Sequence, residues 1–187
     1  LEPDHSAFID DFKNLNQDAQ CLYVRMLNRQ GRLFECRRFN YPEIYDIPQQ
    51  LEALKQYGFI RKLDQSDLKD WFELITRNAL LQLIEQQCSP GSYQRSWLKS
   101  DLVEFALDHL SYSHPSIKES MSHCVVQKRC EQIGYLLFLY FGKAEAGLAR
   151  FTLRDLGVVR TSKFKNKFKP RFNDKKSALS TWFYCQK

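Results

Sequence analysis

The sequence predicts a mainly α-helical fold with a small β component. Apolar residues recur at helical spacing in several segments, and capping residues, prolines or glycines bound these segments. Hydrophobic residues make up 43% of the 187 residues, which is enough to fill a packed core. Short apolar runs beside glycine predict the few strands.

The most regular helical pattern covers residues 18–29 and stops before Gly31, a residue that commonly ends helices. Its apolar positions share one face, so we expect this face to be buried. On the other face, Arg25 and Arg29 are four residues apart, and both guanidinium groups therefore point the same way. The pair is a candidate binding site for an anion.

The residues that follow predict a short extended segment, a helix and a strand. The extended segment covers residues 32–39. It carries two further basic candidates, Arg37 and Arg38. Asp46 is a suitable N-cap for a helix that reaches Tyr57, and the chain then returns as a short strand at residues 59–60. This order of elements is that of a winged-helix module, which we predict over residues 1–62.

Three helices are predicted in residues 63–112, and each follows a serine or threonine that can cap it. They are residues 67–74 after Ser66, residues 77–87 after Thr76 and residues 101–110 after Ser100. Lys99 lies at the start of the last one and is a further basic candidate. A Ser-Pro-Gly-Ser turn separates the last two helices. This arrangement is typical both of small helix-extended-helix DNA-binding units and of ordinary helical domains.

The last part of the sequence begins with a helical region and ends with basic residues. A helix pattern starts near Pro115 and continues over residues 117–141, and its second half is apolar on all sides, which predicts burial. Lysines and phenylalanines then alternate in residues 163–172. We expect the lysines to neutralise phosphates, while Phe164 and Phe168 either stack on bases or face a core. The basic candidates of this part are Arg154, Lys163, Lys165, Lys167, Lys169 and Arg171.

The formal net charge of +6 is concentrated in two segments. Residues 21–41 hold five arginines and one acidic residue, and residues 150–176 hold ten basic and two acidic residues. The rest of the chain is acidic overall. Because local clustering sets the surface potential more than the total charge does, this distribution favours an anionic polymer as partner. Ordinary solvated surface is the alternative.

No complete active site is evident in the sequence. The six cysteines form no CxxC pair, so we interpret them as reduced thiols, and the His and Cys residues of 109–130 lack the paired spacing of a zinc site. The four histidines are expected to be exposed or to cap helices. Asp174-Lys175-Lys176 is the nearest match to the carboxylates and lysine of a metal-dependent nuclease, but no strand pattern precedes it.

The sequence also lacks membrane and export signals. Its longest apolar run, residues 135–141, is far shorter than the ~20 residues that span a bilayer, and the acidic N-terminus has no signal-peptide pattern. The chain opens on Leu1 and not on Met, and it ends soon after an apolar cluster at residues 182–184. We therefore expect a segment of a longer protein.

A family resemblance lies in the first third of the chain. Residues 18–31 read DAQCLYVRMLNRQG and residues 39–44 read FNYPEI, and a helix pattern that ends at Gly58-Phe59 follows. A Leu-Tyr-Val-Arg helix with a second arginine one turn later resembles the N-terminal region of the Fanconi-associated nucleases. Residues 137–141 and 149–160 are similar to that family at lower stringency. In that family, a C-terminal VRR-NUC domain cuts DNA.

The resemblance implies a DNA-binding, non-catalytic region of a structure-specific nuclease of the phosphodiesterase I type, bacterial and active in DNA repair. Arg25 and Arg29 would contact the duplex backbone, and Gln30 stands where the family commonly has lysine. Residues 63–112 would be a SAP-like helical unit, and residues 113–187 a helical and basic linker region before the nuclease domain. Mg²⁺ or Mn²⁺ is expected in that nuclease domain, and no cofactor in this segment.

We therefore predict that the chain positions flap or branched duplex DNA by phosphate contacts, in the bacterial cytoplasm close to the nucleoid. No membrane or small-molecule partner is expected. The nucleic-acid-binding candidates are Arg25, Arg29, Arg37, Arg38, Lys99, Arg154, Lys163, Lys165, Lys167, Lys169 and Arg171. The alternatives are a non-enzymatic interaction module whose basic faces bind an acidic protein, and a small intact enzyme that uses Asp174.

Overall fold

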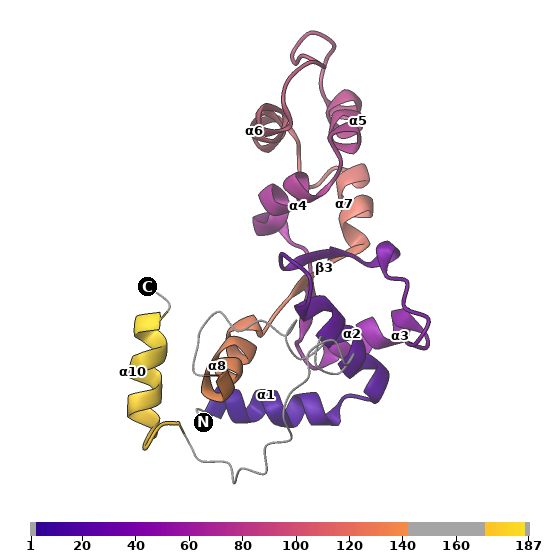
Figure 1. Cartoon of the computed structure of the whole chain (residues 1–187). Coiled ribbons are helices and arrows are strands. Elements are labelled where there is room, and N and C mark those ends of the chain that lie inside the picture. Colours follow the sequence, from indigo (N-terminus) through magenta and orange to yellow (C-terminus); the bar gives the residue numbers. More distant parts are fainter. Residues whose placement is uncertain (1–2, 142–170, 186–187) are drawn as a thin grey trace. The chain divides into compact units, whose positions relative to one another are not determined.

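The computed structural model describes residues 3–141 and 171–185 of the chain (Figure 1). The described part is mainly α-helical with one small β-sheet, which confirms the predicted fold class. It forms two compact units. The first unit comprises the described residues of 1–30, 42–59 and 128–187, and the second unit comprises residues 31–41 and 60–127. The division of the chain after residues 62 and 112 stays a prediction.

Helices make up the first unit. They are α1 (Pro3–Asn14), α2 (Gln17–Leu27), α3 (Ile47–Gln56), α8 (Cys130–Phe141) and α10 (Lys175–Cys185). The helix predicted over residues 18–29 is confirmed as α2, where the Asn16 side chain accepts a hydrogen bond from the N–H of Ala19 at 2.8 Å. The predicted cap of α3 is also confirmed, because Asp46 Oδ1 accepts a hydrogen bond from the N–H of Gln49 at 3.1 Å.

An aromatic cluster forms the centre of the first unit. Tyr23 of α2 and Phe59 are fully buried, and their ring centroids lie 4.8 Å apart. The Tyr23 hydroxyl donates a hydrogen bond to the carbonyl of Lys128 at 2.7 Å. Arg129, which has a φ of +62°, pairs with Asp11 at 2.6 Å and lies 4.9 Å from the ring centroid of Phe59. These contacts fix the chain where it returns to the first unit.

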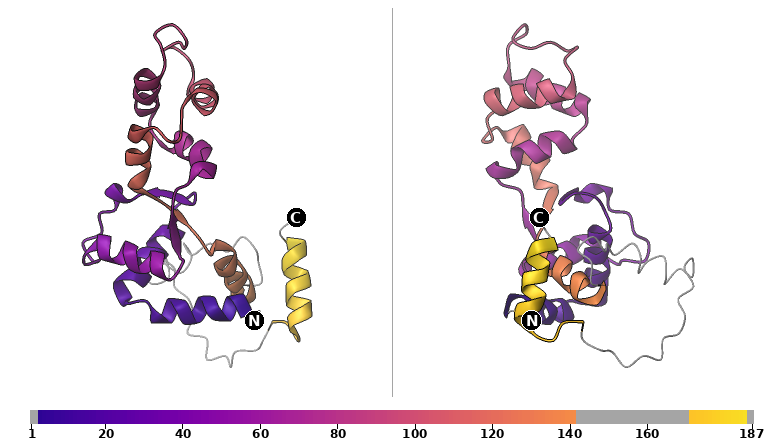
Figure 2. Two further views of the ribbon diagram at one scale, coloured as in Figure 1. Left: turned by 180° about the vertical axis from the view of Figure 1, so that it is seen from behind. Right: turned by 60° about the vertical axis from the view of Figure 1, so that its left-hand side comes forward.

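The apolar helix α8 contacts both α1 and α10 (Figure 2). Phe138 is fully buried, with its ring centroid 5.2 Å from those of Phe172 and Trp182. Tyr135 is buried too, and its ring lies 5.9 Å from that of Trp182. Tyr140 on the same helix is half exposed. The predicted burial of this helix is therefore confirmed for Tyr135 and Phe138 and wrong for Tyr140.

The second unit combines helices with a three-stranded antiparallel sheet. Its elements are β1 (Leu33–Glu35), η1 (Cys36–Arg38), β2 (Ile60–Lys62), η2 (Gln65–Asp67), α4 (Leu68–Leu74), α5 (Arg77–Gln87), α6 (Lys99–His109), α7 (Pro115–Ser122) and β3 (Cys124–Gln127), where η denotes a 3₁₀ helix. The strand order is β1-β3-β2. In the register, Val126 of the central strand lies opposite both Leu33 and Arg61. The return strand predicted at residues 59–60 corresponds to β2.

The central strand corrects the prediction of one helical region over residues 117–141. α7 ends before β3, and α8 begins after it. Val125 and Val126 are buried and lie in the strand that pairs on both sides. β-branched residues suit such a position, and the pairing with two partner strands outweighs the local helical pattern. The partner strands lie far away in sequence, so periodicity alone missed this element.

Two helix starts in the second unit test the predicted caps before α4 and α5. Thr76 caps α5, because its Oγ1 accepts a hydrogen bond from the N–H of Ala79 at 3.2 Å. Before α4, the predicted cap at Ser66 is wrong. The N-cap of α4 is Asp67, which forms no side-chain cap hydrogen bond, and Asp64 caps η2, where it forms a reciprocal capping box with Asp67. Ser66 does not act as a cap because both its N–H and its hydroxyl donate hydrogen bonds to Oδ1 of Asp64.

The start of α6 also differs from the prediction. The helix begins at Lys99, and its N-cap Leu98 has no side-chain cap hydrogen bond. Ser100 lies inside the first turn, where its hydroxyl donates to Asp101 at 3.1 Å, so the predicted cap at Ser100 is wrong. Lys99 is therefore the first residue of α6.

A shared core holds the helices and the sheet of the second unit together. Its fully buried members include Trp71, Phe72, Leu80, Ile84, Leu102, Ala106, Ile117 and Val126. These residues come from α4, α5, α6, α7 and β3, so burial of apolar surface links all of these elements. This core holds in place the elements of the second unit that carry Arg37, Arg38 and Lys99.

Candidate nucleic-acid interface

Arg25 and Arg29 lie on the solvent side of α2 and at its end. Both are exposed, while Leu22, Tyr23 and Met26 are buried, as the helical pattern predicted. The N–H of Arg29 donates a hydrogen bond to the carbonyl of Met26 at 3.0 Å, so the helical turn extends to it. The core contacts of α2 therefore keep both arginines accessible. Their assignment to DNA stays a prediction.

A carboxylate competes for the Arg25 guanidinium. Glu43 forms an ion pair with it, and both side chains remain about half exposed. A hydrogen bond from the backbone N–H of Glu43, together with the Arg25 guanidinium, holds the pKa of the Glu43 carboxyl below its usual range. Glu43 is therefore ionised at neutral pH. An incoming phosphate must displace this carboxylate or share the guanidinium with it.

Arg37 and Arg38 lie on the 3₁₀ turn η1, which follows β1. The predicted extended segment of residues 32–39 therefore ends with β1, and the extended conformation predicted for these two arginines is wrong. The N–H of Cys36 donates a hydrogen bond to the carbonyl of His123 at 2.8 Å. This bond ties the turn to the residue that ends α7. Both arginine side chains are exposed.

The two arginines of this turn have different partners. Arg38 Nε forms an ion pair with Glu35 at 2.6 Å. Arg37 instead contacts Nε2 of His123, and among the described residues no carboxylate lies within ion-pair distance of Arg37. A guanidinium can only donate hydrogen bonds, so Nε2 of His123 is the acceptor in this contact. Arg37 therefore forms no ion pair with a carboxylate of the described residues.

A pocket of about 190 Å³ lies at this turn. Arg37, Arg38, Glu35 and His123 contribute charged or polar groups to its lining, and Cys124 contributes a thiol. Burial, helped by the charge of Glu35, raises the pKa of the Cys124 thiol to about 11. The thiol is therefore neutral at physiological pH and adds no negative charge to the pocket.

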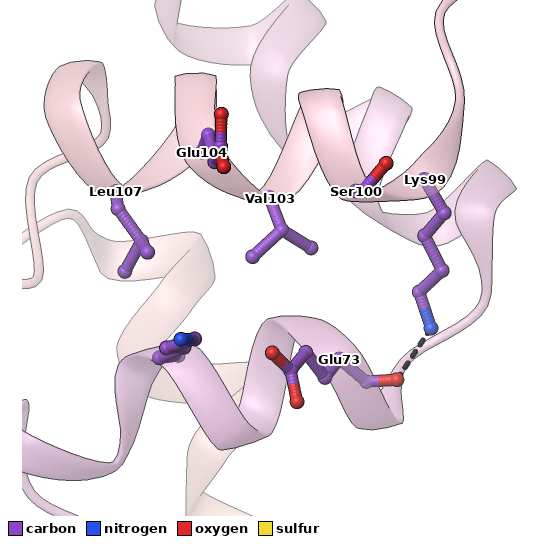
Figure 3. A pocket seen from close by; sticks show the side chains of 7 residues that line it. Glu73, Lys99, Ser100, Val103, Glu104 and Leu107 are labelled. Carbon is purple, nitrogen blue, oxygen red and sulfur yellow. Dashed lines mark hydrogen bonds between the residues drawn. The ribbon is translucent and has the colours of Figure 1, made fainter.

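Lys99 lines a second pocket in the same unit, with a volume of about 410 Å³ (Figure 3). Its ammonium donates a hydrogen bond to the backbone carbonyl of Glu73, at the end of α4. Two lysines, Lys69 and Lys99, face two glutamates, Glu73 and Glu104, in the lining. The formal charges balance, so this pocket offers no net attraction to a phosphate. The predicted contact of Lys99 with DNA stays a prediction.

Arg171 has a partner inside the first unit. Its Nε donates a hydrogen bond to the carbonyl of Tyr140 at 3.1 Å, near the end of α8, where helix carbonyls favour a cation. The other candidates of this part lie outside the described residues. They are Arg154, Lys163, Lys165, Lys167 and Lys169, together with the rings of Phe164 and Phe168. All of these assignments stay predictions.

The described ranges contain no group of three His, Cys, Asp or Glu side chains that could hold a metal ion. Asp174 has a structural contact, since its Oδ1 accepts a hydrogen bond from the N–H of Ser177 at 2.8 Å in the first turn of α10. His114 caps α7, as we expected for one class of histidines. No helix within residues 3–141 and 171–185 is both long and apolar enough to cross a bilayer.

The sequence did not assign His123 to this interface. His123 and Arg37 are 86 residues apart in the chain and meet because Glu35 pairs with Cys124 across β1 and β3. Strand register depends on the tertiary structure, so no local sequence motif predicts the contact between Arg37 and His123. Within the sequence, the adjacent β-branched residues Val125 and Val126 were the pattern that could have predicted this strand.

Several known proteins are similar to this chain in sequence or in fold. The family model described as FAN1, HTH domain matches residues 1–61. A Fanconi-associated nuclease 1 homolog of Arabidopsis thaliana is 25% identical over 175 residues, and the match covers 87% of this chain and 19% of that protein. The homolog of Pseudomonas aeruginosa is 28% identical over 164 residues, which cover 86% of this chain and 28% of that protein.

Two crystal structures of paFAN1, bound to 5′ flap DNA with a gap, share the fold at a TM-score of 0.70. Their sequence identities are 21% and 23%, and each match covers 98% of this chain and 34% of that chain. The chain thus spans between a fifth and a third of the length of these relatives. With the Leu-Tyr-Val-Arg pattern of α2, these matches show that the chain is similar in sequence and fold to part of the Fanconi-associated nuclease 1 homologs.

Proposed function

We propose that the chain is a DNA-binding region of a structure-specific nuclease and holds duplex DNA beside a flap or branch by phosphate contacts. The observation that carries this proposal is the exposed pair of Arg25 and Arg29, which lies inside the segment matched by the FAN1 HTH family. The flap DNA in the paFAN1 structures supports the class of substrate. Contacts of this kind position a duplex and carry little sequence information.

The basic side chains contribute a sequence-independent attraction. Arg25 and Arg29 contribute it in the first unit, and Arg37 and Arg38 contribute it in the second. Each neutralised phosphate releases condensed counterions, so the logarithm of the binding constant falls with the logarithm of the salt concentration by about 0.9 per contact. The proposal extends to the ten basic residues of residues 150–176.

Cutting belongs, in this proposal, to a nuclease domain of the same enzyme that uses Mg²⁺ or Mn²⁺. The described residues do not fit such a metal site, because they offer no group of three suitable ligands. We therefore derive no catalytic step from them. This region would orient the strand that is cut. We also propose that the enzyme acts in the bacterial cytoplasm, and the Pseudomonas relative supports a bacterial source.

Fluorescence anisotropy with labelled 5′ flap and linear duplexes tests the proposal. We expect the 187-residue chain to bind DNA more weakly as salt increases, and to bind the flap substrate more tightly than the linear duplex. The Arg25→Ala/Arg29→Ala double variant should bind about tenfold or more weakly, and its salt slope should fall by about 2. The matched control is Lys13→Ala/Lys55→Ala, which removes two positive charges from α1 and α3.

The outcomes separate the competing functions. Equal binding of DNA and of a heparin control would overturn the DNA-binding proposal, as would an unchanged salt slope in the folded Arg25→Ala/Arg29→Ala variant. Circular dichroism verifies that the variant is folded. Equal affinity for flap and linear duplexes would remove the positioning role. Tight binding to an acidic protein without affinity for DNA would favour the interaction module.

A further inference from the structure

We propose that the pocket beside η1 is a seat for one phosphate group of a nucleic-acid strand, with Arg37 as the binding residue and His123 as its positioning residue. This inference rests on the proposed DNA-binding function and adds a specific contact to it. All of the lining residues belong to the second unit.

Arg37 forms no ion pair with a carboxylate of the described residues. Other exposed arginines of this unit have carboxylate partners: Arg32 pairs with Asp70 at 3.0 Å, and Arg38 pairs with Glu35 at 2.6 Å. Arg37 contacts the imidazole of His123 instead. A guanidinium has five N–H donors in a planar fork, and one contact with His123 leaves donors for the oxygens of a phosphate.

His123 holds the guanidinium of Arg37 at the pocket. His123 ends α7, and its carbonyl accepts the hydrogen bond from Cys36 that holds η1 in place. Its ring nitrogen then contacts the side chain of the neighbouring Arg37. The same residue thus fixes both the backbone of the turn and the guanidinium. A long side chain that is already ordered loses less conformational entropy when it binds an anion.

The size and the charge of the pocket both suit a single phosphate group. Its volume of about 190 Å³ is below the ~300–1,000 Å³ of pockets that enclose whole small-molecule ligands. Such a space suits one phosphate with part of its sugar. Arg37 and Arg38 outweigh Glu35, and the neutral Cys124 thiol adds no charge, so the lining is net positive. The start of α5 at Thr76, another lining residue, adds the positive end of a helix.

The pocket of Lys99 does not offer the same chemistry. Its two lysines are balanced by two glutamates, and the Lys99 ammonium is engaged with a backbone carbonyl. Arg25 in the first unit also has a carboxylate partner, Glu43. Of Arg25, Lys99 and Arg37, Arg37 is the one that lies in a pocket with a net positive lining and forms no ion pair with a carboxylate of the described residues.

Uncharged phosphate analogues test the seat directly. A series of flap duplexes, each with a methylphosphonate at one backbone position, is titrated with the wild-type chain and with Arg37→Ala. We expect one position at which the neutral linkage weakens wild-type binding five- to tenfold but leaves Arg37→Ala binding unchanged. Arg37→Ala itself should bind unmodified DNA five- to tenfold more weakly, with a salt slope lowered by about 0.9.

Two further arms define the ligand and the role of His123. Duplexes with and without a 5′-phosphate distinguish a terminal phosphate from an internal phosphodiester, and both results support a phosphate seat. His123→Ala should reduce the effect of the methylphosphonate at the same backbone position, which a role confined to folding would not do. The matched control is Arg32→Ala, which removes an equal charge whose carboxylate partner already compensates it.

Two results would overturn the seat while leaving the DNA-binding proposal intact. One is wild-type DNA binding together with an Arg37→Ala variant that responds to every methylphosphonate position and every 5′-phosphate as the wild type does. The other is an equal loss of affinity in Arg32→Ala and Arg37→Ala, which would indicate a general charge effect. Absence of DNA binding by the wild type would overturn both proposals. Binding of an acidic protein through Arg37, without a phosphate effect, would assign the pocket to a protein partner.

Discussion

Arg61 of β2 and Asp67 of η2 form a bidentate ion pair. Nη1 of Arg61 lies 2.6 Å from Oδ2 of Asp67, and Nη2 lies 2.8 Å from Oδ1. The carboxylate is 1% exposed and also accepts a hydrogen bond from the N–H of Asp64 at 2.9 Å. The pair thus connects the sheet to the turn that starts α4. Because α4 ends at the pocket beside η1, this connection helps to shape that pocket.

Asp67→Asn should destabilise the second unit. The neutral amide loses the charge-assisted pair and leaves the Arg61 guanidinium without its buried counter-charge. Because Arg61 is 31% exposed and keeps access to water, we expect a loss of about 2 kcal/mol in the free energy of unfolding. Urea unfolding at pH 7 measures it. Asp70→Asn, at an exposed ion pair of the same unit, is the control and should cost well under 1 kcal/mol. Equal losses in the two variants would contradict the prediction.

The same pair predicts how stability depends on pH. The hydrogen bond from Arg61 lowers the pKa of Asp67 below its usual value of 3.8. A carboxyl group whose pKa is lowered in the folded state stabilises that state above the usual pKa, and the contribution disappears as the pH falls through the folded pKa. The difference in stability between wild type and Asp67→Asn should therefore shrink below pH 4. A constant difference from pH 7 to pH 3 would argue against this assignment.

Glu43→Gln should strengthen DNA binding. The substitution removes the carboxylate that competes for Arg25 and also removes its repulsion of phosphate. We expect a two- to fivefold lower dissociation constant at low salt, measured by fluorescence anisotropy. In the Arg25→Ala background the same substitution should have a much smaller effect, because the competition has gone. An equal gain in both backgrounds would show that Glu43 acts only through long-range charge.

Lys99→Met should affect stability more than DNA binding. The variant keeps the aliphatic stem but loses the hydrogen bond to the Glu73 carbonyl, which we expect to cost about 1 kcal/mol. Lys118→Met on the exposed side of α7 is the matched control and should leave stability unchanged. Urea unfolding and the salt slope of DNA binding separate the two roles. A salt slope lowered by about 0.9 in Lys99→Met alone would instead indicate a direct phosphate contact.

Cys124 should resist alkylation. Its pKa of about 11 leaves on the order of one thiolate in a thousand at pH 8, and the side chain is buried. The exposed thiols of Cys21 and Cys185 should react with iodoacetamide much faster. Mass spectrometry of peptides over a time course measures the order of reaction. In urea, all of the cysteines should react at similar rates. Fast reaction of Cys124 in the native protein would mean that β3 opens readily.

Local signals predicted much of the helical fold. The apolar face of α2, the Asp46 cap of α3 and the Thr76 cap of α5 all lie within one or two helical turns of the residues they affect. Such contacts are visible in a single sequence because their spacing is fixed by the helix. The predicted caps at Ser66 and Ser100 were wrong. Asp64 is the residue that caps η2, and α6 begins at Lys99, one residue before Ser100.

The candidate interface was predicted less completely. Charge clustering along the chain led to Arg25, Arg29, Arg37 and Arg38, because those residues are close in sequence. Their partners were not predicted. Glu43 reaches Arg25 from the following loop, and His123 reaches Arg37 across the sheet. Composition shows that a segment is basic, but only contacts across the fold show which of its charges are already compensated.

The sequence by itself determined that this chain is mostly helical, that its basic residues gather in two segments, and that α2 carries an exposed arginine pair. These properties follow from spacing and composition, which a chain has before it folds. Only the tertiary structure decided that β3 enters between β1 and β2 and brings His123 to Arg37. The physical reason is that strand pairing joins distant segments through backbone hydrogen bonds, whose partners are not encoded in any local pattern.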